Sequence, residues 1–202
     1  MGARELEKLA RQFEASGDKD ITQGVSAWAQ VARAGGRETF SESPVLPEGV
    51  IRLPDLTIGG IKSKELGKLL IANGYRVSDY AGDLMKKMPT LKDQKTISLV
   101  IATPSVMRLT GNPTTEQIYE RADRLNWDLC PAEVGPHLRL AYKDQPMNEL
   151  LYIGMKQIAG RSGDPRVFSV ARFDDGSWLN GRWARPTSRW NPTSQFVFSL
   201  RK

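Results

Sequence analysis

Six residues near the carboxyl end of the chain have side chains suited to holding a flat or an anionic partner. They are three of the chain's five tryptophans and three arginines: Trp178, Arg182, Trp183, Arg185, Arg189 and Trp190. An indole ring stacks on planar groups, and a guanidinium binds anions through a rigid fork of N–H donors. Stacking of one nucleic-acid base on an aromatic ring contributes ~1–3 kcal/mol. We therefore take these six residues as the candidate binding surface.

The same residues also fit an ordinary β-sheet. On a strand, Arg182 and Trp183 point to opposite faces, as do Arg189 and Trp190, so the rings can enter the core while the cations face water. Tryptophan carries too much apolar surface to be left in water without a reason. We expect at least two of the three rings in the core. Pro186 interrupts the segment, so strict alternation is not assured.

A second interpretation makes the protein an enzyme. His137 is the only histidine, and Glu133 lies four residues before it in CPAEVGPHLRLAY. An imidazole and a carboxylate in one pocket suit proton transfer or hydrolysis. In a third interpretation, exposed tryptophans bind a carbohydrate or another small ligand in a concave aromatic groove without strong basic potential.

Several well-defined chemistries have no signature in the sequence. The phosphate-binding P-loop, the dinucleotide fingerprint and the nucleophile elbow of esterases are all missing. Cys130 is the only cysteine, so an intrachain disulfide is excluded, and a site built from several Cys and His ligands is excluded as well. Cys130 ends an apolar segment and is expected to be buried. We predict no cofactor and no metal.

The charge of the chain favours an anionic partner. The net charge is +6, and residues 131–202 hold eleven Lys and Arg against six Asp and Glu. After Lys156, every cation up to Arg201 is an arginine. Nucleic acid and an acidic protein are both candidate partners, although a charged face also serves solubility alone. No apolar run reaches the ~20 residues of a membrane span, so we expect no membrane partner and a cytoplasmic location.

The pattern of residues before position 62 predicts an accessory part. Residues 1–36 read as a helical hairpin, with helices over 3–15 and 22–34, because apolar residues recur at helical spacing. Residues 37–61 contain three prolines and the pair Gly59-Gly60, which indicates a connector packed along a surface.

Residues 62–202 are predicted to form an α+β domain. Helices are expected over 64–73, 79–87 and 115–125, the last with a capping box of Thr114 and Gln117. Strands are expected over five segments: 96–103, 138–142, 150–158, 166–173 and 195–201. Asp175-Gly176 is a hairpin signal after the strand 166–173. The predicted fold class is α+β, with a helical N-terminal portion followed by an antiparallel β-meander.

The domain resembles a recurrent module of uncharacterised bacterial proteins. The matching stretches are IYERADRLNWDLCPAEVGPHLRLAY (118–142), DQPMNELLYIGM (144–155) and RVFSVARFDDGSWLNGRWARPTSRWNPTSQFVF (166–198). They cover about two thirds of the chain, and CPAEVGP and the terminal W…W…FVF stretch are the most specific. The resemblance implies an intact domain and no particular activity. The sequence thus favours an intracellular, non-enzymatic binding or accessory protein.

Overall fold

The computed structural model describes residues 46–201, and the predicted hairpin over 1–36 lies outside them. The described residues belong to one compact unit, Leu46–Lys202. Its helices are α3 (Ser63–Ala72), α4 (Asp79–Lys87), α5 (Thr115–Arg124) and α6 (Val134–Ala141). Its strands are β1 (Ile51–Arg52), β2 (Leu56–Ile58), β3 (Arg76–Val77), β4 (Lys95–Ile97), β5 (Leu99–Ala102), β6 (Trp127–Asp128), β7 (Leu150–Ile153), β8 (Ile158–Ala159), β9 (Pro165–Phe173), β10 (Gly176–Trp183) and β11 (Gln195–Leu200). The predicted α+β class is confirmed.

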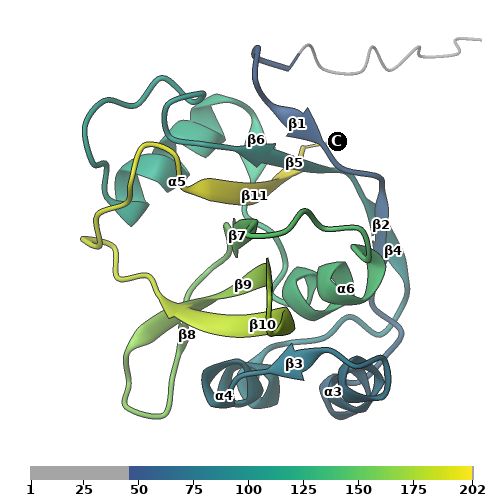
Figure 1. The fold of residues 1–202 in the computed structure, drawn as a ribbon. Coiled ribbons are helices and arrows are strands. Elements are labelled where there is room, and N and C mark those ends of the chain that lie inside the picture. The colour runs from purple at the N-terminus through teal and green to yellow at the C-terminus, as the bar shows by residue number, and fades with distance from the viewer. Residues whose placement is uncertain (1–45, 202) are drawn as a thin grey trace, which may run out of the picture. The chain divides into compact units, whose positions relative to one another are not determined.

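The main sheet is mixed, so the predicted antiparallel meander is not confirmed. Its strand order is β1-β5-β11-β7-β9-β10-β3, with β6 beside β11 and β8 beside β9 (Figure 1). The last strand does not follow β10 in space: β11 runs parallel to β7 and antiparallel to β5. Residues 196–200 are all buried, and a strand buried on both faces belongs in the middle of a sheet rather than at its edge.

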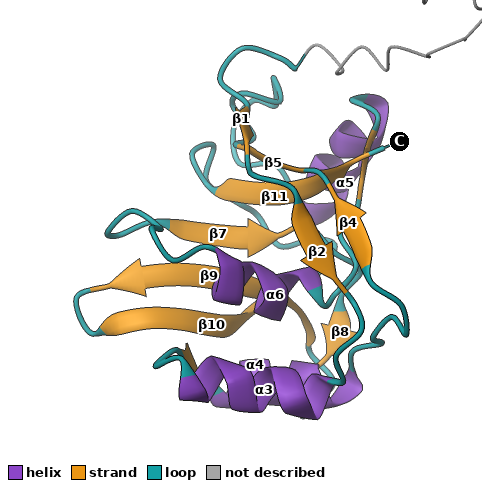
Figure 2. Cartoon of the chain, turned by 90° about the vertical axis from the view of Figure 1, so that its right-hand side faces the viewer, coloured by secondary structure: helices purple, strands orange, loops and turns teal. Residues whose placement is uncertain are grey.

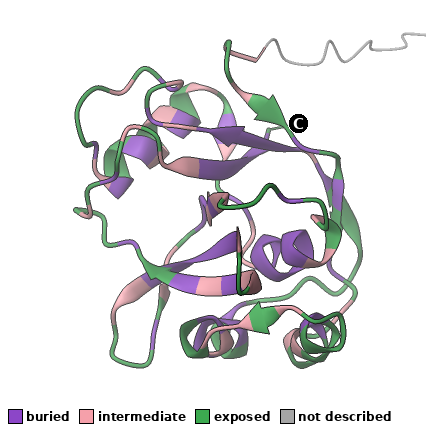
Figure 3. Ribbon diagram, viewed as in Figure 1, coloured by how far each residue is buried: buried purple, intermediate pink, exposed green. Residues whose placement is uncertain are grey.

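Helices α5 and α6 cover opposite faces of this sheet (Figure 2). Gly135 of α6 packs on Phe168 of β9, where an added Cβ would lie only 2.7 Å from the ring. On the other face, Tyr119 of α5 makes an edge-on contact with Phe198, with ring centroids 6.2 Å apart. The buried residues form a continuous core between these layers (Figure 3). Within residues 46–201, no helix has the length and apolar character that a membrane crossing requires.

The strand predicted over 138–142 is wrong, since these residues continue α6. Leu138 and Leu140 lie on either side of the charged Arg139, as in a two-faced strand, but Val134 and Leu138 also have the four-residue spacing of a helix. Pro136 lies in the first turn, where its missing N–H costs no intrahelical bond. The amide of Tyr142 donates to the carbonyl oxygen of Leu138 at 2.8 Å, which closes the last turn.

Part of the segment predicted as a connector belongs to the sheets. β1 pairs with β5, and β2 pairs with β4 in a separate two-stranded sheet. Leu53, Leu56 and Ile58 are all buried in the core. The compact unit therefore begins before residue 62, where the sequence placed the domain boundary.

The local helix signals agree with the structure. The capping box is present: the amide of Gln117 donates to the hydroxyl oxygen of Thr114, and the Thr114 amide donates to the Gln117 side chain. The hydroxyl oxygen of Ser78 caps α4 by accepting from the Ala81 amide at 3.2 Å. Ser63 lies in the first turn of α3 and donates its hydroxyl to the carbonyl oxygen of Met85.

Candidate functional site

Two of the six predicted residues, Arg182 and Trp183, line a hollow of about 400 Å³ at the end of β10. Tyr80 of α4 and Arg166 of β9 line it as well, and we call it the Arg166 groove. The groove lies where the short strand β3 ends beside β10 and the chain turns into α4 (Figure 1).

The groove is organised around a guanidinium held between two aromatic rings. The Arg166 guanidinium carbon lies 3.8 Å from the centroid of the Tyr80 ring and 5.2 Å from that of the Trp183 ring. β9 and β10 pair Arg166 directly with Trp183, which puts both side chains on one face of the sheet. The stack therefore follows from the register of the hairpin together with the docking of α4.

Arg166 is buried without an acidic partner. Its residue surface is only 5% exposed, and its Nη1 donates to the carbonyl oxygen of Gly181 at 3.3 Å. Among residues 46–201, no carboxylate forms an ion pair with it. Burial of an unneutralised cation is costly, and the two aromatic faces and the carbonyl offset part of that cost. The positive charge at the groove is thus left uncompensated.

The outer surfaces of the two rings are open to solvent. Trp183 is 62% exposed and Tyr80 is 51% exposed, although large aromatic side chains are usually mostly covered. Arg182 is exposed beside them on the same strand. A flat ligand can therefore reach the indole from solvent, whereas the Arg182 side chain leaves β10 on the face opposite Trp183.

Two glycines make room for the stack. A Cβ on Gly181 would lie 2.9 Å from the backbone carbonyl carbon of Tyr80, so a side chain there would push α4 away. A Cβ on Gly160 would lie 3.1 Å from Nε of Arg166. Gly181 therefore needs to be a glycine, whereas a side chain at position 160 would require Arg166 to shift by a few tenths of an ångström.

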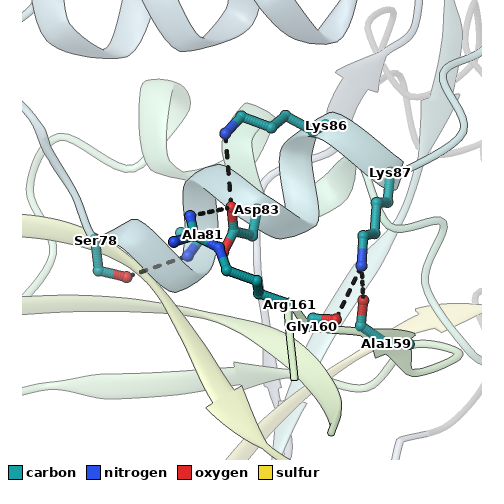
Figure 4. Close-up of polar contacts among 8 residues, drawn as sticks. All are labelled: Ser78, Ala81, Asp83, Lys86, Lys87, Ala159, Gly160 and Arg161. Atoms are coloured by element: carbon teal, nitrogen blue, oxygen red, sulfur yellow. Dashed lines mark hydrogen bonds and ion pairs between the residues drawn. The ribbon is translucent and has the colours of Figure 1, made fainter. Parts of the chain in front are cut away.

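Polar contacts attach α4 to the loop that precedes Arg166, as Figure 4 shows. Nζ of Lys87 donates to the carbonyl oxygens of Ala159 and Gly160 at 2.7 and 2.9 Å. Arg161 donates to Asp83 at 3.0 Å, and this hydrogen bond holds the pKa of the Asp83 carboxyl below its usual value. These contacts join the two segments that supply Tyr80 and Arg166.

The other four predicted residues are engaged elsewhere. Trp190 is buried, donates its Nε1 proton to the Thr115 hydroxyl at 2.8 Å, and packs edge-on against Tyr152 and Phe196. Trp178 is half-buried and donates to Asp175 at 2.9 Å.

The two remaining arginines bind neighbouring loops. Arg185 pairs with Asp164 at 2.7 Å, and Arg189 donates to the carbonyl oxygen of Asn112 at 3.0 Å. The structure therefore brings Arg182 and Trp183 together with two residues that sequence reasoning missed, Tyr80 and Arg166. The pairing of Arg166 with Trp183 is a consequence of hairpin register, and Tyr80 is 86 residues away from Arg166 in sequence.

The Glu133–His137 pair lies in the interior. Oε2 of Glu133 is 3.8 Å from Nε2 of His137, and both residues are buried. Burial raises the pKa of the Glu133 carboxyl and lowers that of the His137 imidazole, so both are shifted toward their neutral forms. Neither residue lines the Arg166 groove. A catalytic pair must be able to contact a substrate. A ligand bound in the Arg166 groove would not contact either of these buried side chains.

The cysteine and the acidic residues do not suggest a second reactive site. Cys130 is buried as expected, and burial raises the pKa of its thiol, which keeps the thiolate form scarce. Within the described part of the chain, no three His, Cys, Asp or Glu side chains are grouped as metal ligands. Comparisons with protein-family models, with curated proteins and with solved structures found no match.

Proposed function

We propose that the protein is a non-enzymatic binding or accessory protein that holds single-stranded nucleic acid in the Arg166 groove. The observation that carries the proposal is the exposed Trp183 ring stacked over the unneutralised guanidinium of Arg166. The cytoplasmic location and the resemblance to a bacterial module are expectations from the sequence.

A nucleotide uses each part of the groove. A base stacked on Trp183 would extend the row of planar groups formed by Tyr80, Arg166 and Trp183. The adjoining phosphate would pass around the end of β10 toward Arg182, which is exposed and leaves the strand on the face opposite Trp183. Double-stranded DNA keeps its bases inside the duplex, so exposed-ring stacking favours a single strand.

The charges of the groove separate this proposal from its two closest alternatives. A neutral carbohydrate uses aromatic rings but has no need of two arginines, Arg166 and Arg182, in the same hollow. An acidic protein satisfies the arginines but offers carboxylates rather than planar rings to Trp183. Each nucleotide of a nucleic acid carries both a planar base for Trp183 and an anionic phosphate for an arginine.

The test is binding of a fluorescein-labelled 12-residue oligo(dT) and oligo(U), measured by anisotropy at 50 and 200 mM NaCl. We expect binding that weakens as salt rises, because phosphate contacts release bound counterions. Trp183→Ala removes the stacking surface and should weaken binding about tenfold or more, within the range of one base–ring contact. Trp183→Phe should retain part of the affinity.

A matched control is Arg124→Ala. Arg124 is an exposed cation on α5, away from the groove, and its loss should change affinity little. Absence of binding at 50 mM NaCl, or equal affinity of wild type and Trp183→Ala, would overturn the proposal. Binding of poly-glutamate in place of both oligonucleotides would instead support an acidic protein partner.

A further inference from the structure

Helices α3 and α4 pack side by side (Figure 1). Residues of both helices line a second groove of about 560 Å³. Its apolar lining comes from Ile71 of α3, Met85 of α4 and Val77 of β3. Lys64 and Lys86 stand at its rim, one from each helix. This groove shares no lining residue with the Arg166 groove and is called the α3–α4 groove below.

Helix α3 has more apolar surface than its core face needs. Leu66 and Leu70 are fully buried on the inner face. Ile71, at the groove, is nevertheless 69% exposed, and the neighbouring Leu69 is 41% exposed. An exposed aliphatic side chain that lines an apolar groove, as Ile71 does, is typical of a surface that another molecule covers.

Two helix glycines keep the groove open. Gly67 and Gly82 lie inside α3 and α4, and both line the groove. Packing does not require either one: a Cβ on Gly82 would meet no atom within 4 Å, and one on Gly67 would meet the Met85 Cε at an ordinary 3.6 Å. Glycine destabilises a helix interior relative to alanine, so two dispensable glycines facing one hollow indicate a need for space.

The charges around the groove select for an acidic occupant. Lys64, Lys68 and Lys86 are exposed on the two helices. Asp83 lies between two cations, with Lys86 at 3.6 Å and Arg161 at 3.0 Å, so its single charge does not neutralise both. An apolar channel with Lys64 and Lys68 on the α3 side and Lys86 on the α4 side is complementary to a helix with one apolar stripe and acidic flanks.

We propose that the α3–α4 groove binds an acidic amphipathic helix of a protein partner. Apolar side chains of that helix at positions i, i+3 or i+4 and i+7 would lie over Gly67 and Gly82 and against Ile71 and Met85. Its flanking carboxylates would face Lys64 and Lys86. This inference does not depend on the proposed nucleic-acid site, since α4 contributes different residues to each groove.

The test uses a synthetic 16-residue N-acetylated peptide with leucine at helical three- and four-residue spacing and glutamate elsewhere. The comparison peptides have the same composition in scrambled order, or lysine in place of glutamate. Anisotropy gives the affinity, and NMR of the Ile71, Val77 and Met85 methyl groups of the full chain locates binding. We expect the ordered acidic peptide to bind at least tenfold more tightly than either comparison peptide and to shift these three methyl signals.

Gly82→Leu fills the groove and should reduce affinity about tenfold, while the melting temperature verifies that the variant is folded. Glu120→Leu on α5 adds the same side chain to a helix surface away from the groove and should leave affinity unchanged. Lys64→Glu combined with Lys86→Glu should reverse the preference between the glutamate and lysine peptides. Three results would overturn the inference. The scrambled peptide could bind as tightly as the ordered one, folded Gly82→Leu could bind the ordered peptide with wild-type affinity, or the protein could bind only anionic phosphatidylglycerol vesicles.

Discussion

At the scale of single residues, several ionisable side chains are buried, where a charged group loses its hydration. Their surroundings differ in two ways. Around the Arg166 guanidinium, two rings and a carbonyl oxygen replace part of its hydration. Glu133 and His137 are instead shifted toward neutrality by burial. The first arrangement places a positive charge directly beneath the exposed Trp183 ring, and the second affects the stability of the fold.

The Glu133 carboxyl should make stability depend on pH in a defined direction. Its pKa is raised in the folded state, so folding is favoured while the group is protonated, and that contribution is lost as pH rises through the folded-state pKa. Glu133→Gln removes this ionisation and keeps an oxygen for the Leu91 amide, which donates to Oε1 at 3.1 Å. We expect the variant to gain stability over wild type as pH rises from 4 to 8.

The measurement is urea unfolding of both proteins at several pH values. Taking the difference between them cancels most other titrating groups, although His137 is close enough to respond. Glu48→Gln, at an exposed position, is the control and should show a nearly constant difference from wild type. A Glu133→Gln difference that falls with rising pH would contradict the assignment of this carboxyl as destabilised by burial.

At the scale of secondary-structure elements, α4 determines both grooves. One end carries Tyr80 over Arg166, and the opposite side carries Gly82 and Met85 against α3. Its hydrogen bonds to residues 159–161 fix its position relative to β9. Glycines near this helix should therefore differ in their response to substitution, according to what each one faces.

We predict opposite effects for Gly181→Ala and Gly82→Ala. The first places a methyl group 2.9 Å from backbone and side-chain atoms of Tyr80 and should destabilise the fold by about 1–3 kcal/mol. The second meets no neighbour within 4 Å and should stabilise the fold by about 0.5–1 kcal/mol, since alanine favours the helix. Chemical unfolding of the two variants beside wild type measures both. If both variants change the free energy of unfolding in the same direction, the close approach of Tyr80 is not the reason for a glycine at position 181.

Elements with local signals could be predicted from sequence, and elements determined by distant contacts could not. The caps of α4 and α5 lie next to the helices they start, so both helices were predicted closely. The sequence 138–142 satisfies helix and strand spacing alike, and only packing on Phe168 distinguishes them. The hairpin was predicted, but its turn is Asp174-Asp175 rather than Asp175-Gly176.

That displacement explains why the site was only partly foreseen. A turn shifted by one residue changes every cross-strand pair, so the contact between Trp183 and Arg166 could not be deduced from the segment alone. Tyr80 joins them through tertiary docking of α4. Composition did indicate the correct strand, because Arg182 and Trp183 were both among the candidates.

At the scale of the whole molecule, the sheet depends on residues that the sequence assigned to a connector. β1 forms the edge beside β5, and β2 is the partner of β4. Leu53, Leu56 and Ile58 bury nearly all of their surface there. Full burial of one such side chain contributes roughly 1.5–3 kcal/mol, and a domain's total stability is typically about 5–15 kcal/mol.

Two fragments should therefore behave differently. A fragment of residues 46–202 retains β1 and β2 and should unfold cooperatively on heating. A fragment of residues 62–202, the domain as drawn from the sequence, loses three buried aliphatic side chains and exposes β5 and α6, so it should be largely unfolded or aggregate. Near-ultraviolet circular dichroism and thermal unfolding distinguish these states. Cooperative unfolding of the shorter fragment at the same temperature as the longer one would mean that β1 and β2 are not required for the fold, and that the core closes without them.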